Sequence, residues 1–259
     1  MPKIAFDFGK NWERYSDLLT PEQLQTAQKS LSENLGPDGL RNKSFIDIGC
    51  GSGIFSICAG LLGSKRVVGM DVNNKCVEIS RKNSERFINR EIKPEFIQES
   101  ILNREGINKL GRFDVVYAWG SLHHTGDMKK AIEISSQLVN SGGIFWLAIY
   151  NKHFSSPMWK RIKYFYNHAG IPVRKMMVYF FLGVIFIAKF LVTFKNPLAK
   201  ERGMDFFYDV VDWVGGYPYE YASTGEIVSQ VEELGFQTLK MVPAEVPTGC
   251  NEYLFLKKS

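Results

Sequence analysis

Residues 44–60 read SFIDIGCGSGIFSICAG, a short apolar run followed by a glycine-rich turn and a second apolar run. The run at 45–48 predicts a buried strand, and residues 53–62 predict a helix that begins directly after the glycines. Glycines at a strand-to-helix turn let the backbone bend tightly and let a ligand approach it closely. The stretch therefore predicts the first strand–helix unit of an open α/β sheet, with a ligand site at the carboxyl edge of that sheet.

The alternation of strands and helices continues along the chain. Further strands are expected at 67–71, 95–98, 113–118 and 144–150, and helices at 21–35, 74–87 and 128–139. Nearly continuous apolar strands separated by helices predict a parallel sheet covered on both faces. After a helix at 224–234, strands at 236–242 and 252–256 are expected to close the sheet as an antiparallel pair. The predicted fold class is α/β: a Rossmann-like, seven-stranded, mostly parallel sheet with helices on both faces and a helical insertion.

Composition excludes several classes of protein. The chain has 259 residues, of which 45% are hydrophobic and 23% charged, which is typical of a globular protein and not of a disordered one. Its net charge of +5 permits anionic partners without requiring them. The four cysteines form no CxxC pair, so no metal site is expected. The start, MPKIAFDFGKNWERY, has no apolar signal core, so a cytoplasmic location is expected, with peripheral membrane contact as the alternative.

The spacing of the glycines indicates the kind of nucleotide that the loop would accept. A dinucleotide site of the type GxGxxG would need glycine at position 54, which is Ile54. The loop instead reads GxGxG, with Asp47 just ahead of it. Asp71 ends the second predicted strand, where a carboxylate can accept hydrogen bonds from both ribose hydroxyls of an adenosine. The combination favours an adenosine cofactor over a nicotinamide dinucleotide.

These residues resemble those of the class I S-adenosylmethionine-dependent methyltransferases. Asp47 and the glycines match the first motif of that family, and Asp71 matches its ribose-binding acid. Residues 98–101 lie where the family cradles adenine, with Ser100 where many members have Asp. The stretches FDVV (113–116), WGSLHHT (119–125) and SGG (141–143) resemble the later motifs. The resemblance implies S-adenosylmethionine as cofactor, S-adenosylhomocysteine as product, and a methyltransferase of class EC 2.1.1.

The resemblance also implies a set of cofactor-binding residues. They are Asp47, Gly49, Cys50, Gly51, Gly53, Asp71, Val72, Ser100, Ile101 and Trp119. A narrower resemblance is to an uncharacterised bacterial subgroup whose members are often labelled quinone- or sugar-associated methyltransferases. It is carried by FGKNW (8–12), IYN (149–151), DWVGGYPYE (212–220) and GCNE (249–252).

Methyl transfer from a sulfonium requires an aligned nucleophile, exclusion of water and, for a hydroxyl acceptor, removal of a proton. His123 and His124 follow the fourth strand and are the candidate catalytic bases, since imidazole titrates near neutrality. The alternative is that they are loop histidines bonded to the backbone. Trp12, Tyr15 and Trp119 are expected either around the cofactor and acceptor or in the core. The candidate acceptor-binding residues are Asn11, Trp12, Tyr150, Asn151, Tyr217, Tyr219, Glu220, Tyr221 and Asn251.

Residues 176–194, MMVYFFLGVIFIAKFLVTF, form an apolar helix with one charge, Lys189. The helix would be about 28 Å long, close to the thickness of a bilayer core. A single crossing would nevertheless separate two parts of one sheet, so we do not expect it to span a membrane. The segment is expected to be a lid over the site, a homodimer surface, or a membrane-surface contact. In the last case, nearby basic residues would meet anionic headgroups: Lys160, Arg161, Lys163, Arg174 and Lys175.

The sequence thus predicts four parts and one reaction. The parts are an N-terminal aromatic segment and helix (1–43), a cofactor-binding core (44–150), a helical insertion or lid (151–205), and the end of the same sheet (206–259). The reaction is methyl transfer to a small molecule, at a hydroxyl of a sugar, a glycan intermediate or a phenolic compound. The alternatives are a lipid or quinone methyltransferase at the membrane surface, an RNA methyltransferase, and a non-catalytic cofactor-binding scaffold. Nucleic acid is the less expected partner, because no appended RNA-binding domain is visible.

Overall fold

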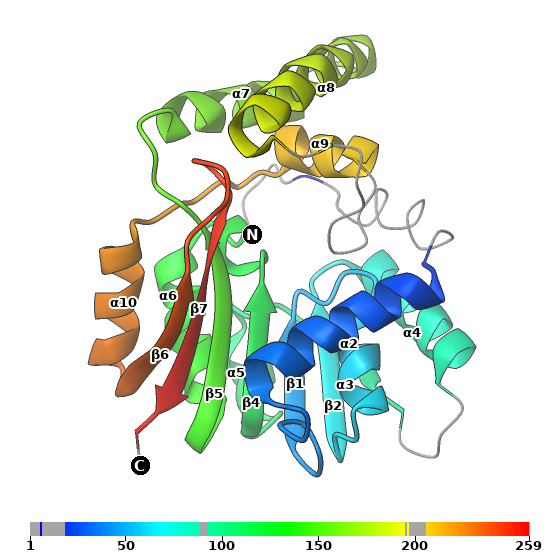
Figure 1. Ribbon diagram of the computed structural model, residues 1–259, viewed down its shortest axis with the longest axis vertical. Helices are drawn as coiled ribbons and strands as arrows, with labels where there is room; N and C mark the ends of the chain where they lie inside the picture. The colour runs from blue at the N-terminus through cyan, green and yellow to red at the C-terminus, as the bar shows by residue number, and fades with distance from the viewer. Residues whose placement is uncertain (1–5, 7–18, 89–92, 195, 197–205, 259) are drawn as a thin grey trace.

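The computed structural model describes residues 6, 19–88, 93–194, 196 and 206–258. Its centre is a seven-stranded sheet in the order β3-β2-β1-β4-β5-β7-β6. The strands are β1 (Ser44–Ile48), β2 (Arg66–Asp71), β3 (Glu95–Gln98), β4 (Phe113–Trp119), β5 (Val139–Tyr150), β6 (Phe236–Val242) and β7 (Cys250–Lys257). The strands β1 to β5 run parallel, and β7 lies antiparallel between β5 and β6. The predicted fold class is confirmed (Figure 1).

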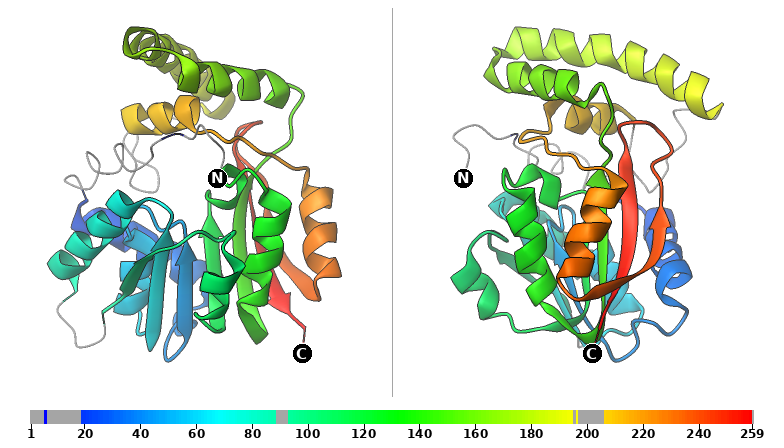
Figure 2. Two further views of the ribbon diagram at one scale, coloured as in Figure 1. Left: turned by 180° about the vertical axis from the view of Figure 1, so that it is seen from behind. Right: turned by 90° about the vertical axis from the view of Figure 1, so that its left-hand side faces the viewer.

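Helices form three groups around the sheet. One face is covered by α2 (Pro21–Leu35), α3 (Ile54–Leu61) and α4 (Asn74–Phe87), and the other by α5 (Arg104–Asn108), α6 (Met128–Gln137) and α10 (Thr224–Glu233). A third group lies beyond the carboxyl ends of the strands, at the top of Figures 1 and 2. It consists of α7 (Ser156–His168), α8 (Ile171–Thr193) and α9 (Phe206–Gly215).

Side-chain alternation along the strands divides the interior into two cores. Successive strand residues point to opposite faces of a sheet. Phe45 and Tyr117 therefore lie in the core beneath α2 and α3, whereas their neighbours Ile46 and Val116 lie in the core beneath α6 and α10. All four side chains are at most 2% exposed. A sheet apolar on both faces needs both helical layers, as the nearly continuous apolar strands predicted.

The start of β5 differs from the expectation. We predicted a helix to residue 139 and a strand from 144, but α6 ends at Gln137 and β5 begins at Val139. Phe113 pairs with Val139 while Val115 pairs with Ile144, so residues 140–143 bulge out of the ladder. Gly142 has φ +69°, a conformation that glycine adopts at little cost. The glycines at 142 and 143, which we expected to separate the helix from the strand, instead lie within the strand and permit a bulge.

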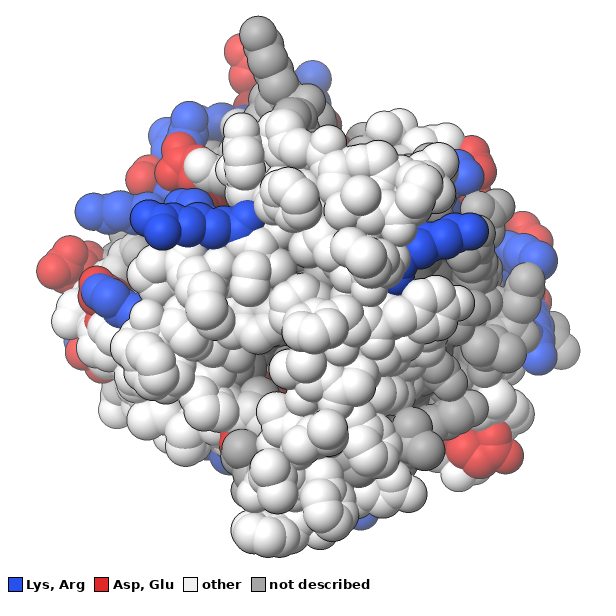
Figure 3. Space-filling view, turned by 90° about the horizontal axis from the view of Figure 1, so that it is seen from above, with Lys and Arg blue, Asp and Glu red and all other residues white. Residues whose placement is uncertain are grey.

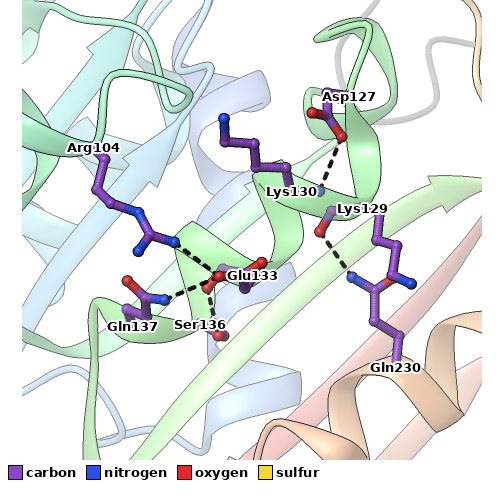
Figure 4. A network of polar contacts seen from close by, with 8 residues as sticks. All are labelled: Arg104, Asp127, Lys129, Lys130, Glu133, Ser136, Gln137 and Gln230. Atoms are coloured by element: carbon purple, nitrogen blue, oxygen red, sulfur yellow. Dashed lines mark hydrogen bonds and ion pairs between the residues drawn. The ribbon is translucent and has the colours of Figure 1, made fainter.

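Polar contacts on the outside of one helical layer link its three helices (Figure 4). The Arg104 guanidinium donates to Glu133 at 2.8 Å, and the Gln230 amide donates to the carbonyl of Lys129 at 2.8 Å. The Arg104–Glu133 ion pair is about half exposed on both sides. Exposed pairs of this kind contribute about 1 kcal/mol or less. The layer is therefore held mainly by the apolar core beneath it.

The helices α7, α8 and α9 have a small core of their own. Tyr166, Val178, Val210 and Val214 are buried against one another, with α8 contributing the inward-facing Val178. The helix α8 begins at Ile171, five residues before the predicted start, with Pro172 in its first turn. Proline is tolerated there because the first N–H groups of a helix have no intrahelical partner.

Candidate active site

The loop after β1 is held in a conformation that requires glycine. Gly49 has φ +78°, and a Cβ built there would lie 2.4 Å from the Cβ of Ser121. Gly53 also has φ +78°, and its Cβ would lie 2.8 Å from the Ser80 side chain. Both the backbone conformation and the close packing exclude a side chain at these positions. The loop therefore turns tightly at the carboxyl edge of the sheet, as the sequence predicted.

Two side chains of α4 hold the glycine loop in place through hydrogen bonds to its backbone. The Ser80 hydroxyl donates to the carbonyl of Gly51 at 3.1 Å, and the Asn83 amide donates to the carbonyl of Ser52 at 2.9 Å. Residues three apart on a helix share a face, so both donors point at the same loop. Ser80 and Asn83 were not predicted from the sequence as residues of the site. Their signal was polar side chains on the inward face of a helix next to a glycine loop.

Asp71 ends β2 beside this loop and is partly exposed. One carboxylate oxygen accepts from the Gly51 N–H at 3.1 Å, and the other accepts from the Asn73 N–H at 2.9 Å. Burial raises the pKa of Asp71, and these backbone N–H groups partly offset that effect. Hydroxyl donors would further stabilise the carboxylate, because each oxygen has a second lone pair. The residue therefore fits a ribose diol, and Val72 beside it, 49% exposed, offers apolar surface for an adenine ring.

The other predicted cofactor residues are more buried. Asp47 is 3% exposed and accepts from the Ser56 hydroxyl at 2.9 Å, and burial raises its pKa to about 7. Cys50 and Ile101 are 7% and 5% exposed. The Ser100 hydroxyl accepts from the Leu102 N–H at 3.3 Å, which shapes the turn after β3. These side chains support the loops from inside the protein. Of the predicted cofactor-binding side chains, Asp71 is therefore the main polar group that the carboxyl edge of the sheet offers to a cofactor.

The loop after β4 carries the two histidines on a short 3-10 helix, η1 (Leu122–His124). The Nδ1 atom of His124 lies 2.6 Å from the carbonyl oxygen of Pro218. A carbonyl can only accept, so Nδ1 carries the proton and Nε2 carries the lone pair. Burial lowers the pKa of His124 to about 3, so its ring is neutral at physiological pH. His124 is partly exposed and has the tautomer that a proton acceptor at Nε2 needs.

His123 differs from its neighbour. Its side chain is fully buried, and its ring lies 3.9 Å from that of Tyr150, measured between centroids. Neither ring nitrogen has a hydrogen-bond partner of good geometry among the described residues. Burial lowers the pKa of His123 well below its usual value, and His124 and Lys163 lower it further. The structure therefore favours His124 over His123 as the candidate base.

A buried lysine lies among the residues predicted to bind the acceptor. The ammonium of Lys163, on α7, lies 4.2 Å from the ring centroid of Trp213, 4.8 Å from that of Tyr219 and 5.8 Å from that of Tyr150. It also donates to the carbonyl of Trp213. We call these four residues the Lys163 cluster. Aromatic faces stabilise a cation, but burial still lowers the pKa of Lys163 to about 7.

The Lys163 cluster corrects one expectation. Lys163 is 0% exposed, so it does not meet headgroups at a surface. Arg174 is also partly buried, and its guanidinium donates to the carbonyls of Ala169 and Asn167. Lys163 and Trp213 were not predicted as site residues. No local sequence pattern marks Lys163, since it belongs to a basic helix whose other lysine and arginine side chains are exposed.

The remaining acceptor candidates form a scaffold around the cluster. The Glu220 carboxylate accepts from the Met128 N–H at 3.1 Å and so caps α6. The Asn251 amide is 2% exposed, and it donates to the side-chain oxygen of Asn151 at 3.1 Å. Tyr217 and Tyr221 are partly exposed, whereas Tyr219 is fully buried. Direct contact with an acceptor therefore stays a prediction for these residues, and the structure gives most of them a supporting role.

Three residues that were predicted to lie near the cofactor or the acceptor cannot be placed. They are Asn11, Trp12 and Tyr15, which lie outside the described residues. Within the described ranges, no group of three or more His, Cys, Asp or Glu side chains is arranged to hold a metal ion.

Comparisons with known proteins agree with this geometry. A family model described as "Methyltransferase domain" matches residues 21–176. The mitochondrial ubiquinone biosynthesis O-methyltransferase of Dictyostelium discoideum is 28% identical over 140 residues, which are 52% of this chain and 44% of that protein. The corresponding enzyme of Methylobacterium sp. (strain 4-46) is 29% identical over 123 residues, 47% of each chain. This chain thus spans about half the length of the curated relatives it matches.

A solved structure extends the similarity over the whole fold. The magnesium protoporphyrin IX methyltransferase of Synechocystis PCC 6803 with bound SAH superposes with a TM-score of 0.57 at 15% identity, covering 91% of this chain and 83% of that one. The sheet order, the glycine loop and Asp71 define a class I methyltransferase that uses S-adenosylmethionine. The chain belongs to the methyltransferase-domain family whose model it matches over more than half its length.

Proposed function

We propose that the protein transfers the methyl group to a hydroxyl of a small-molecule acceptor, and that this acceptor is a phenolic precursor of the quinone type. The observation that carries the proposal is the orientation of His124. Its Nδ1–H is held by the carbonyl of Pro218, so the lone pair of Nε2 can accept the proton of a hydroxyl at the end of β4.

The low pKa of His124 decides how such a base would act. When bound, the cofactor supplies an electrophilic methyl group on a sulfonium. A neutral imidazole with a pKa of about 3 cannot fully ionise a hydroxyl before the reaction. A hydroxyl that is gaining a methyl group becomes strongly acidic, so the proton passes to Nε2 as the carbon–oxygen bond forms. His124 would thus orient the hydroxyl first and remove its proton late.

Two further observations support a phenolic acceptor over a sugar. The partly exposed rings of Tyr150 and Trp213 lie 5.3 Å apart, between centroids, and the buried ring of Tyr219 supports that of Tyr150 at 5.1 Å. Aromatic surfaces bind a flat ring well because stacked and edge-to-face pairs are favourable. The relatives named above are ubiquinone O-methyltransferases, although this chain covers only about half of their length.

The test is to follow a radiolabelled methyl group from S-adenosylmethionine into a fractionated extract of the source cells. We expect the label in the lipid-extractable fraction, in a product that carries the methyl group as a methoxy substituent of an aromatic ring. Label in polar small molecules would favour a sugar or glycan acceptor, and label in RNA would overturn the proposal. Binding of the cofactor without transfer to any fraction would favour a non-catalytic scaffold.

A variant of Asp71 separates enzymatic label from background. Asp71→Ala removes the ribose-binding carboxylate and is expected to abolish transfer to every fraction. Label that persists with this variant comes from a contaminating enzyme and does not count for any acceptor.

A further inference from the structure

The outer face of α8 is apolar and uncovered. Its inward side chains, Val178 and Phe181 among them, pack against the small core of α7 and α9. The opposite side chains are exposed, with Tyr179 at 69%, Phe180 at 64% and Ile187 at 59%. A surface helix of a soluble domain normally carries polar residues on that side. An apolar patch of this extent indicates a partner.

The helix passes a length and composition test for membrane contact. Residues Ile171–Ala188 have a mean hydropathy of 1.8, and only 6% of that window is buried, so it is not the core helix of a globular domain. The flanking α7 adds exposed aromatic side chains, Tyr164 at 51% and Phe165 at 59%. Figure 3 looks onto this side of the molecule: uncharged side chains fill the middle of the face, and most visible Asp and Glu side chains lie at its margins.

The charge of the chain is divided unevenly around this patch. Residues 134–200 contain nine Lys or Arg and no Asp or Glu, whereas the rest of the chain contains 23 basic and 27 acidic residues. Lys160, Arg161 and Lys175 are exposed on α7 and α8. Lysine and arginine next to an apolar helix face are typical of helices that lie in the headgroup region of a bilayer.

The packing of α8 argues for contact with the membrane surface rather than insertion across it. Both α7, which precedes α8, and α9, which follows it, pack against its inward side. The helix therefore lies along the layer, with one long side facing outward (Figure 2).

The charge also argues against a second copy of the chain as the partner. A symmetric dimer brings the same patch of both subunits together. It would place two segments without acidic residues against each other, whereas an anionic bilayer has the complementary charge.

We propose that the exposed face of α8, flanked by the basic residues of α7 and α8, docks on the surface of an anionic lipid bilayer. In this orientation the carboxyl edge of the sheet, with the candidate active site, lies just beneath the layer that contacts the membrane. The inference rests on exposure and charge and does not depend on the identity of the methyl acceptor.

Vesicle flotation of the full chain tests this inference. The probes are vesicles of phosphatidylcholine alone and of equal parts phosphatidylcholine and phosphatidylglycerol, at low and high salt. We expect the protein to float with the anionic vesicles, less with the neutral ones, and less at high salt. Phe180→Ser with Ile187→Ser is expected to weaken binding by roughly tenfold or more, because each apolar side chain then loses its transfer to the bilayer.

Two further variants keep the test falsifiable if the serine pair is poorly folded. Arg161→Gln with Lys175→Gln removes two exposed positive charges and no apolar residue, and loss of each charge is expected to weaken binding to anionic vesicles about fivefold. Leu239→Ser with Met241→Ser changes two exposed apolar residues on β6 and is expected to bind vesicles normally. Affinity for S-adenosylhomocysteine shows which variants are folded.

Three results would overturn the inference. The first is a wild-type chain that stays at the bottom with both kinds of vesicle. The second is a control variant on β6 that loses binding as much as the α8 variant. The third is a chain that does not bind vesicles but sediments as a dimer that Phe180→Ser with Ile187→Ser dissociates, which would assign the face to a second copy.

Discussion

The cofactor half of the candidate site, over β1 to β3, and the half that we propose for the acceptor, over β5 and α7, are built by different means. In the cofactor half, β1, the turn and helix α3 that follow it, and β2 place Gly49 and Asp71 within 23 positions of the sequence. In the proposed acceptor half, His124, Lys163 and Tyr219 come from segments up to 95 positions apart. The first half depends on local backbone geometry, and the second depends on how a helical layer packs onto the sheet.

The two halves also differ in how they treat charge. Asp71 is partly exposed, and backbone N–H groups hold it where a ligand can add further donors. Lys163 is fully buried among rings and donates to the carbonyl of Trp213. An exposed charge can exchange water for a ligand, whereas a buried cation costs stability unless it is well paired. We therefore expect that substitutions can alter cofactor binding and acceptor binding separately.

The largest effect is expected for Asp71→Ala. The variant loses a carboxylate suited to two charge-assisted hydrogen bonds, each contributing about 1.5–3 kcal/mol. Affinity for S-adenosylhomocysteine should fall by about 100-fold or more, measured by titration calorimetry. The matched control is Glu95→Ala, an exposed carboxylate at the opposite end of the sheet, which should bind normally. Equal affinities for the two variants would remove Asp71 from the cofactor site.

Gly49→Ala tests whether the loop depends on backbone geometry. The φ of +78° costs an L-residue about 1–2 kcal/mol, and the contact with Ser121 adds to it. We expect a loss of about 3 kcal/mol in the free energy of unfolding, measured by urea titration. Gly225→Ala on α10 has open space around its Cβ and should instead stabilise the protein by about 0.5–1 kcal/mol. A tolerated alanine at position 49 would mean that the loop is not constrained as described.

Structure that depends on local backbone geometry could be predicted from the sequence, and structure that depends on the packing of distant segments could not. The strands, the glycine loop and Asp71 follow from periodicity and from residues a few positions apart, and the structure places them as expected. The start of β5 could not be predicted because a bulge and a helix stop use the same glycines. Lys163 could not be separated from Lys160 and Arg161 because burial depends on the packing of α7 against Trp213, which no local pattern encodes.

His124→Ala is expected to slow transfer without weakening cofactor binding. Loss of a positioned proton acceptor lowers kcat by about 100-fold. Because the pKa of His124 is about 3, its contribution to the rate should be flat between pH 5 and 8. His123→Phe keeps a buried ring of similar shape, and its kcat should remain close to that of the wild type. The assay is incorporation of label into the acceptor fraction identified above, and a larger loss for His123→Phe would reverse the assignment.

The smallest effect, and the one that probes the acceptor half most directly, is expected for Lys163→Met. Burial lowers the pKa of Lys163 to about 7, against about 10.4 in an unfolded chain. Between these values the unfolded chain binds a proton that the folded chain does not, so Lys163 destabilises the fold increasingly as pH falls from about 10 to about 7. Below pH 7 both states are protonated and the penalty is constant.

Lys163→Met removes this penalty but leaves the carbonyl of Trp213 without its donor. We therefore expect a net gain of about 1–2 kcal/mol at pH 6, measured by urea unfolding, and a smaller gain at pH 9. Lys160→Met, on the exposed side of the same helix, should change stability little at either pH. A gain independent of pH would mean that Lys163 stays protonated in the folded protein across this range, with a pKa that burial does not lower. A more stable variant that transfers methyl groups more slowly would mean that the protein retains this buried cation for acceptor binding and not for folding.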